Sequence, residues 1–276
     1  MEHLTKIKQN YPNFSKTEKL VADFFIHNYQ TSSGKPITEV ADITGVSKGT
    51  VLSFARKLGY QGYRDFILHF SSSITMPNYL ELDKGSSLGD IMQHAFTTSI
   101  NSIENTMLVC SEEVVEKCIL HMSQAKRIDF FGMGAGSIIA QDAQQKFLRI
   151  NKISYAFADS LMQTTVAATL TPADVCVVIS YSGESIGTIH IAELAKKQGA
   201  FVISITKYSE NSISRIAHAN LYVSSPEPEF RSAATGSRIA QLCIIDILYM
   251  AVLNQDYDNV KQYLNTTREE LRKSKT

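Results

Sequence analysis

The sequence predicts a small all-helical domain followed by a larger α/β domain whose five strands form one parallel sheet. Helix-start signals and apolar residues at helical spacing fill the first 73 residues, whereas short apolar runs alternate with helical patterns in the second half. The stretches 71–77 and 83–87 are rich in turn-forming residues, as is typical of a linker. We therefore expect domains at 1–77 and 106–276, joined by a linker and a connecting helix over 78–105, with the boundary near residue 78.

The N-terminal domain carries the signals of a helix-turn-helix. Ser15-Lys-Thr-Glu18 is a capping box, in which each side chain satisfies a free backbone N–H at the start of a helix. Thr38 is expected to cap a short helix over 39–44, which Gly45 ends because glycine tolerates a left-handed backbone. Ser47 is expected to cap a second helix over 48–58, and an amphipathic helix follows over 60–73. Two helices around a tight glycine turn are the pattern that presents a recognition helix to the major groove of DNA.

Five short apolar runs in the second half predict the strands of the sheet. The run Val175-Cys-Val-Val-Ile179 is apolar throughout, as in a strand buried on both faces, so the sheet should be parallel and covered by helices on both sides. The longest apolar run, Cys243–Leu253, contains Asp246 and is shorter than the roughly 20 residues of a membrane span. We interpret it as a buried helix. The five predicted strands are Arg127–Phe131, Ile153–Phe157, Asp174–Ser180, Ala200–Thr206 and Leu221–Val223.

Two loops that follow predicted strands have the composition of a phosphate site. Gly132-Met-Gly-Ala-Gly-Ser137 follows the first strand, and Ser180-Tyr-Ser-Gly-Glu-Ser185 follows the third. Ligands of open parallel sheets bind at the carboxyl ends of the strands, where these loops should lie. Glycines allow the backbone to approach an anion, and hydroxyls with helix N-terminal N–H groups suit a phosphate monoester without requiring a metal. We predict a phosphate-binding site there.

The composition limits the class of protein. Residues 1–80 contain nine Lys or Arg against six Asp or Glu, a net charge of +3 within a chain that is neutral overall, so basic charge coincides with the helix-turn-helix. No secretory signal pattern opens the sequence and no pattern requires a cofactor, so we expect a cytoplasmic protein without one. The cysteines lack metal-ligand spacing, and we expect no metal site and four reduced thiols: Cys110, Cys118, Cys176 and Cys243.

Both domains resemble one known family. The two glycine- and serine-rich loops resemble those of the sugar isomerase (SIS) phosphosugar-binding domain, and the first 77 residues resemble the helix-turn-helix of RpiR-family regulators. The resemblance spans nearly the whole chain. It is carried by Gly132-x-Gly-x-x-Ser137, Ser180-x-Ser-Gly-Glu-Ser185, Val46–Val51, Lys57–Tyr60, Gly62-Tyr63, Ser237–Leu242 and Asp246.

The resemblance implies a three-layer α/β/α SIS domain that binds a phosphorylated sugar. Residues expected to bind this effector lie in the two loops: Gly134, Ser137, Ser180, Ser182, Glu184 and Ser185. The family also favours a hexosamine or N-acetylhexosamine 6-phosphate. Paired helix-turn-helix units read half-sites one DNA turn apart or a multiple of it, so we expect a homodimer or a dimer of dimers on double-stranded operator DNA.

The expected recognition helix presents a polar face at helical spacing. Hydroxyls near its start can reach base edges, while Lys and Arg can reach phosphates. Such regulators commonly have an arginine just before the phenylalanine of this helix, and this chain has Ser53 before Phe54. Arg56 and Lys57 are candidates to take over phosphate contacts. The expected DNA-binding residues are Ser47, Lys48, Thr50, Ser53, Arg56 and Lys57.

We expect a regulator and not an enzyme, but two enzyme classes are alternatives. Asp159 follows the second strand, at the position where a dinucleotide-binding fold has an acidic residue that binds a ribose hydroxyl. The other interpretation is that Asp159 caps a helix that begins before Leu161. Glu229 and Arg231 lie in a polar loop, 224–235, that could close over a ligand. A sugar-phosphate isomerase would need a base near neutral pH, for which the candidates are Glu184, His190, His218 and Glu229.

Overall fold

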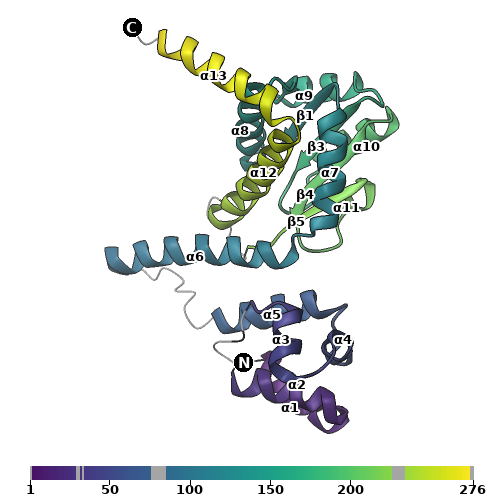
Figure 1. Ribbon diagram of the computed structural model, residues 1–276, viewed down its shortest axis with the longest axis vertical. Coiled ribbons are helices and arrows are strands. Elements are labelled where there is room, and N and C mark those ends of the chain that lie inside the picture. Colours follow the sequence, from purple (N-terminus) through teal and green to yellow (C-terminus); the bar gives the residue numbers. More distant parts are fainter. Residues whose placement is uncertain (1, 29–31, 33, 76–84, 226–233, 274–276) are drawn as a thin grey trace. The chain divides into compact units, whose positions relative to one another are not determined.

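The computed structural model describes residues 2–28, 32, 34–75, 85–225 and 234–273. The chain divides into two compact units, Met1–Ile100 and Asn101–Thr276, and Figure 1 shows the elements of each. The predicted boundary near residue 78 and the loop residues Glu229 and Arg231 lie outside the described residues.

The N-terminal unit is helical, as predicted. Its elements are α1 (Glu2–Asn10), the 3-10 helix η1 (Tyr11–Asn13), α2 (Lys16–His27), α3 (Ile37–Thr44), α4 (Lys48–Lys57) and α5 (Tyr63–Thr75). The long helix α6 (Leu88–Val109) begins in this unit and ends in the next. The core is aromatic: the ring of Phe25 stacks on Phe54 at 5.9 Å and meets the edges of Phe66 and Phe70 at 4.9 Å each.

Most predicted helix ends are confirmed, and two are corrected. The Ser15–Glu18 capping box is formed, Gly45 ends α3 at φ 66°, and the Ser47 hydroxyl accepts from the Thr50 N–H. Thr38 is not a cap, because α3 already begins at Ile37, with Pro36 in the N-cap position and no side-chain cap. The next helix begins at Tyr63 rather than at residue 60.

The second unit contains the predicted five-stranded parallel sheet. The strands are β1 (Arg127–Gly132), β2 (Ser154–Tyr155), β3 (Asp174–Ile179), β4 (Phe201–Lys207) and β5 (Ala219–Val223), in the order β2-β1-β3-β4-β5. All four neighbouring pairs are parallel. The helices are α7 (Glu112–Gln124), α8 (Ala135–Arg149), α9 (Ser160–Ala168), α10 (Ile186–Lys197), α11 (Ser212–Ile216), α12 (Thr235–Gln255) and α13 (Tyr257–Lys273).

The sheet lies between two helical layers. Buried side chains of α7, α8 and α12 pack on one face, and those of α9, α10 and α11 pack on the other. Helix α12 is long and apolar enough to cross a membrane by length and composition, but its apolar stripe, including Ile244 and Leu248, belongs to the core of the sheet domain. It is the buried helix that the run Cys243–Leu253 predicted. All four cysteines are free thiols, as expected.

Candidate functional site

The two predicted phosphate loops meet at the carboxyl edge of the sheet. Strands β1 and β3 are neighbours, with Gly132 opposite Ile179, and the strand order reverses between them. After β1 the chain turns into α8 on one face, and after β3 it turns into α10 on the other face. This arrangement is the topological switch point at which open α/β sheets bind ligands.

The loops also contact each other directly. A Cβ added to Gly136 would lie 2.6 Å from the carbonyl oxygen of Ile179, so the start of α8 packs on the end of β3. A Cβ on Gly187, in the first turn of α10, would lie 2.0 Å from Cε of Met133 in the other loop. Glycine at these two positions therefore allows the loops to close on a common space.

The first loop supplies a helix start without a side-chain cap. Gly134 occupies the N-cap position of α8 with φ 55°, which favours glycine. The hydroxyl of Ser137 donates to the Gly134 carbonyl at 2.7 Å. An anion at this helix start would therefore compete with the loop carbonyl for the Ser137 hydroxyl proton.

The second loop leaves the first turn of α10 uncapped. Ser185 is the N-cap residue, but its hydroxyl accepts no hydrogen bond from that turn and instead lies 3.9 Å from Sδ of Met133. The Ser182 hydroxyl accepts from the Glu184 N–H at 3.2 Å, which leaves its own proton for another acceptor. Ser180, almost fully buried, continues the sheet by donating its N–H to Ile205 O at 3.1 Å. Hydroxyls therefore lie beside a helix start whose N–H groups donate to no side-chain cap among the described residues.

Glu184 holds the second loop against α11. Its carboxylate accepts from the Ser212 N–H at 2.9 Å and from the Ser212 hydroxyl at 2.6 Å. These hydrogen bonds lower the pKa of Glu184, so the group is ionised and weakly basic at neutral pH. It therefore suits loop positioning better than proton abstraction.

The other candidate bases in the described part of the chain are His218 and His190. His218 precedes β5 and accepts from the Val202 N–H near the start of β4, so it lies at the amino edge of the sheet, opposite the two loops. Burial lowers its pKa. His190 is exposed on α10. Asp159 is the N-cap of α9 and accepts from the Met162 N–H at 2.8 Å, as the helix-cap interpretation predicts.

A hydrogen-bonded network connects the second loop to α6. The hydroxyl of Tyr181, between Ser180 and Ser182, donates to the carbonyl of Ser225 at 2.6 Å. The hydroxyls of Ser225 and Ser102 lie 2.9 Å apart, so the network continues from the end of β5 to α6. Thr106, one turn further along α6, accepts from the Ser224 N–H at 3.0 Å. This Tyr181–Ser225–Ser102 network was not predicted, because it joins residues that are far apart in the sequence.

In the N-terminal unit, the recognition helix predicted from the sequence is α4. Lys48 and Arg56 are exposed, and Ser47 and Thr50 share a hydrogen bond between their hydroxyls at 3.0 Å. The inward side of the helix carries Val51, Phe54 and Ala55, which are fully buried. The first turn and the basic end of α4 therefore remain accessible.

Comparisons with known proteins agree with both halves of this description. Residues 1–77 match the family model of the helix-turn-helix domain of the rpiR family, and residues 121–251 match that of the SIS domain. The chain is 32% identical to an uncharacterised HTH-type transcriptional regulator of Caldanaerobacter subterraneus subsp. tengcongensis, over 97% of this chain and 96% of the relative. It belongs to the rpiR family of transcriptional regulators.

Two further proteins resemble this rpiR-family regulator along most of its length. The HTH-type transcriptional regulator YbbH of Bacillus subtilis is 30% identical over 91% of this chain and 90% of its own. The solved structure of the NanR protein of Vibrio vulnificus complexed with ManNAc-6P has a TM-score of 0.61 and 25% identity, and the match covers 98% of both chains. The order of the two domains is therefore shared with full-length relatives.

Two residues of the predicted DNA-binding set in this rpiR-family chain, Ser53 and Lys57, bind a buried carboxylate of their own domain. The Ser53 hydroxyl donates to Glu18 Oε1 at 2.8 Å, and Lys57 Nζ lies 2.7 Å from Glu18 Oε2. Glu18 is 3% exposed. Burial raises its pKa, but the hydrogen bonds from Lys57, Ser15 and Ser53 outweigh burial and lower the pKa to about 2. The serine in place of the family's arginine thus helps to hold a buried carboxylate of α2.

Glu18→Gln is expected to destabilise the N-terminal domain at neutral pH by about 1–2 kcal/mol, because Lys57 is partly exposed and solvent screens the pair. The folded pKa lies below the unfolded one, so this stabilisation is present above about pH 4.5 and is lost as the pH falls toward 2. Hydrogen exchange in α2 and α4 should be faster in the variant at pH 7, with a smaller difference at pH 3. Glu39→Gln, which breaks an i,i+4 pair with the partly exposed Lys35, is the control and should cost less than about 0.5 kcal/mol. Equal exchange of Glu18→Gln and wild type at pH 7 would contradict the assignment.

Proposed function

We propose that this chain is a cytoplasmic DNA-binding regulator whose affinity for operator DNA is changed by a phosphorylated sugar. The observation that carries the proposal is the uncapped start of α10, which faces the start of α8 across the switch point and is surrounded by hydroxyls. Such a constellation suits the three oxygens and the charge of a phosphate monoester. Because the same chain contains a helix-turn-helix, binding of the sugar phosphate can change the affinity of the protein for DNA.

An N-acetylhexosamine 6-phosphate is the proposed effector class. The support is the likeness to the NanR structure, which is complexed with ManNAc-6P and matches both domains. The alternative function, isomerase catalysis, has less support, because Glu184 has a lowered pKa and His218 lies at the opposite edge of the sheet.

We also propose that the Tyr181–Ser225–Ser102 network transmits occupancy of the site to the DNA-binding domain. Tyr181 lies between two serines of the phosphate loop, so a ligand that reorders this loop would change the position of its ring. Ser102 and Thr106 belong to α6, the helix that leads back toward the N-terminal domain. A coupling free energy of about 1–3 kcal/mol would change operator affinity roughly 5- to 150-fold.

A homodimer is the proposed assembly. Helix α6 has large apolar side chains that are exposed in the single chain, among them Phe96 at 63% and Met107 at 74%. Burial of these side chains against a second copy would stabilise a dimer. Sedimentation velocity of wild type and Phe96→Glu tests the assignment: we expect a dimer for wild type and a shift toward monomer for the variant, and a wild-type monomer would contradict it.

To test the proposed function, effector binding and DNA binding are measured on the same preparation of the protein. A thermal-shift screen compares N-acetylhexosamine 6-phosphates with their unphosphorylated sugars and with NAD(H). We expect stabilisation by one phosphorylated sugar alone, and its loss in Ser182→Ala. Stabilisation by NAD(H) alone would contradict the proposal.

The DNA-binding half of the test uses the double variant Lys48→Ala/Arg56→Ala, which removes two exposed basic side chains of α4. Loss of two phosphate contacts should lower affinity for duplex DNA of any sequence and reduce the slope of log affinity against log salt by about two. Lys57 is avoided because its removal would leave Glu18 buried without its cation. Arg64→Ala, on α5, is the control. An unchanged slope in Lys48→Ala/Arg56→Ala would exclude α4 as the DNA-binding helix.

A further inference from the structure

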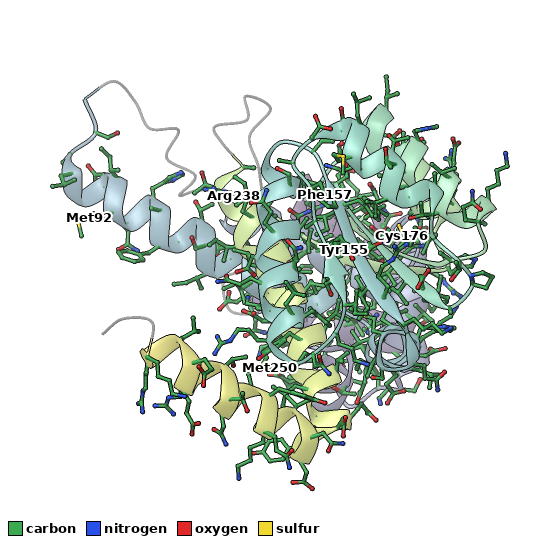
Figure 2. The ribbon with its side chains drawn as sticks, turned by 90° about the horizontal axis from the view of Figure 1, so that it is seen from above. Met92, Tyr155, Phe157, Cys176, Arg238 and Met250 are labelled. Atoms are coloured by element: carbon green, nitrogen blue, oxygen red, sulfur yellow. The ribbon has the colours of Figure 1, made fainter. Side chains whose placement is uncertain are left out.

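Helix α12 brings polar side chains to the same edge of the sheet as the phosphate loops. It runs parallel to α8, because residues that come later in one helix contact residues that come later in the other. Lys146 forms an ion pair with Asp246, and the rings of Phe147 and Tyr249 lie 6.0 Å apart. Beyond both helices, the charge of Asp256 acts on Lys152. Ser137 precedes Lys146 by nine residues, and Ser237 precedes Asp246 by nine residues, about 14 Å along each helix. The N-terminal turns of α8 and α12 therefore lie at the same level, and Figure 2 labels Arg238 near this end of α12 and Met250 near the other.

Gln241 lies in the second turn of α12, and its amide nitrogen has no hydrogen-bond partner among the described residues. Its side chain is 3% exposed and shares the buried side of α12 with Ile244 and Leu248, which face the sheet. Within the described residues, its Nε2 donates no hydrogen bond. The buried Nε of Arg238, one turn earlier, donates none either. A buried amide without an acceptor costs about 1–3 kcal/mol. Such a group in a native protein indicates a bound ligand or water.

A second donor without a partner lies on the other face of the same edge. Thr188, in the first turn of α10, is 1% exposed, and its hydroxyl makes no hydrogen bond to any described residue. Thr188 shares the sheet-facing side of α10 with Ile191 and Ala192. Buried donors without a described partner thus occur in both helical layers, in the first turn of α10 and in the second turn of α12, the two ends of these helices that follow the carboxyl edge of the sheet. Such donors are expected beside a crevice that takes an oxygen-rich ligand.

We propose that Gln241 is a specificity-determining residue whose amide donates a hydrogen bond to an oxygen atom of the sugar in the phosphorylated effector. That oxygen belongs either to a ring hydroxyl or to an acyl carbonyl. The inference rests on the proposed function, since the phosphate is bound by the loops after β1 and β3. The phosphate anchors the ligand at the starts of α8 and α10, and the sugar extends toward α12. Because a sugar lacking the accepting oxygen would leave the amide buried and unpaired, Gln241 discriminates among sugars that share the phosphate.

The test compares Gln241→Met with Gln144→Met in the full chain. Gln144, in the third turn of α8, is the matched control, because its amide already donates to the Ser154 carbonyl at 3.1 Å. Titration calorimetry with N-acetylhexosamine 6-phosphates and with inorganic phosphate gives the affinities, and thermal unfolding without ligand gives the stabilities.

We expect Gln241→Met to bind the sugar phosphate on the order of tenfold more weakly, with unchanged affinity for inorganic phosphate and no loss of melting temperature. Gln144→Met should lose a few degrees of melting temperature and keep its affinity. Wild-type affinity in Gln241→Met would overturn the proposal, as would a melting temperature lowered as much as in Gln144→Met. Uptake of inorganic phosphate but of no sugar phosphate by wild type would instead contradict the proposed function.

Discussion

Gly183→Ala is expected to abolish sugar-phosphate binding. Gly183 has φ 70°, and an added Cβ would lie 2.1 Å from Oδ1 of Asn211. Asn211 cannot yield easily, because it is 2% exposed, its Oδ1 accepts from the Ser214 N–H at 2.9 Å and its Nδ2 donates to Thr206 at 3.1 Å. The loop itself must therefore move, which carries the Ser182 hydroxyl away from the start of α10. The strain should also cost roughly 2–4 kcal/mol of stability.

The measurement is titration calorimetry of the sugar phosphate, with thermal unfolding in parallel. Gly199→Ala is the matched control, since Gly199 also has positive φ, 84°, and an added Cβ there would lie 3.0 Å from Pro172. Gly199 follows α10 at its far end. This control should lose stability but keep binding. Retained affinity in Gly183→Ala would show that the second loop does not hold the phosphate.

Tyr181→Phe is expected to separate effector binding from the DNA response. The variant keeps the ring but loses the hydroxyl that donates to the Ser225 carbonyl at 2.6 Å. Sugar-phosphate affinity should change by less than about threefold, because the phosphate-loop serines and the α10 start are untouched. The change in operator affinity on adding effector should fall from roughly 5- to 150-fold toward none. Fluorescence anisotropy of labelled operator DNA, with and without effector, measures this ratio.

Tyr222→Phe is the control for this variant. Tyr222 lies on β5, three residues before Ser225 in the sequence, and its ring packs edge-on against Tyr208 at 5.3 Å. The control should keep the wild-type effector response. An unchanged response in Tyr181→Phe would mean that the network only holds the loop in place. Loss of sugar-phosphate binding in Tyr181→Phe would make the tyrosine part of the binding site rather than of the coupling.

Local signals in the sequence predicted both domains and the two candidate loops. The Ser15–Glu18 box, the Gly45 turn and the Ser47 cap each depend on residues within four positions of one another, so the sequence alone contains the interaction. Strand boundaries were nearly right for the same reason, except for the second strand, which pairs only through Ser154 and Tyr155. The error at Thr38 arose because proline in the N-cap position leaves no role for a hydroxyl two residues later.

What the sequence determined is therefore the order of elements, the family resemblance and the strand ends at which a ligand should be sought. The tertiary structure alone decided which side chains are already engaged and which are not. Glu18 is joined to Lys57 across 39 residues, and Tyr181 to Ser225 across 44. Gln241 could be identified as a buried donor without a partner in the described part of the chain only once its burial was known. The physical reason is that hydrogen bonding between distant elements depends on how they pack, which no local spacing specifies.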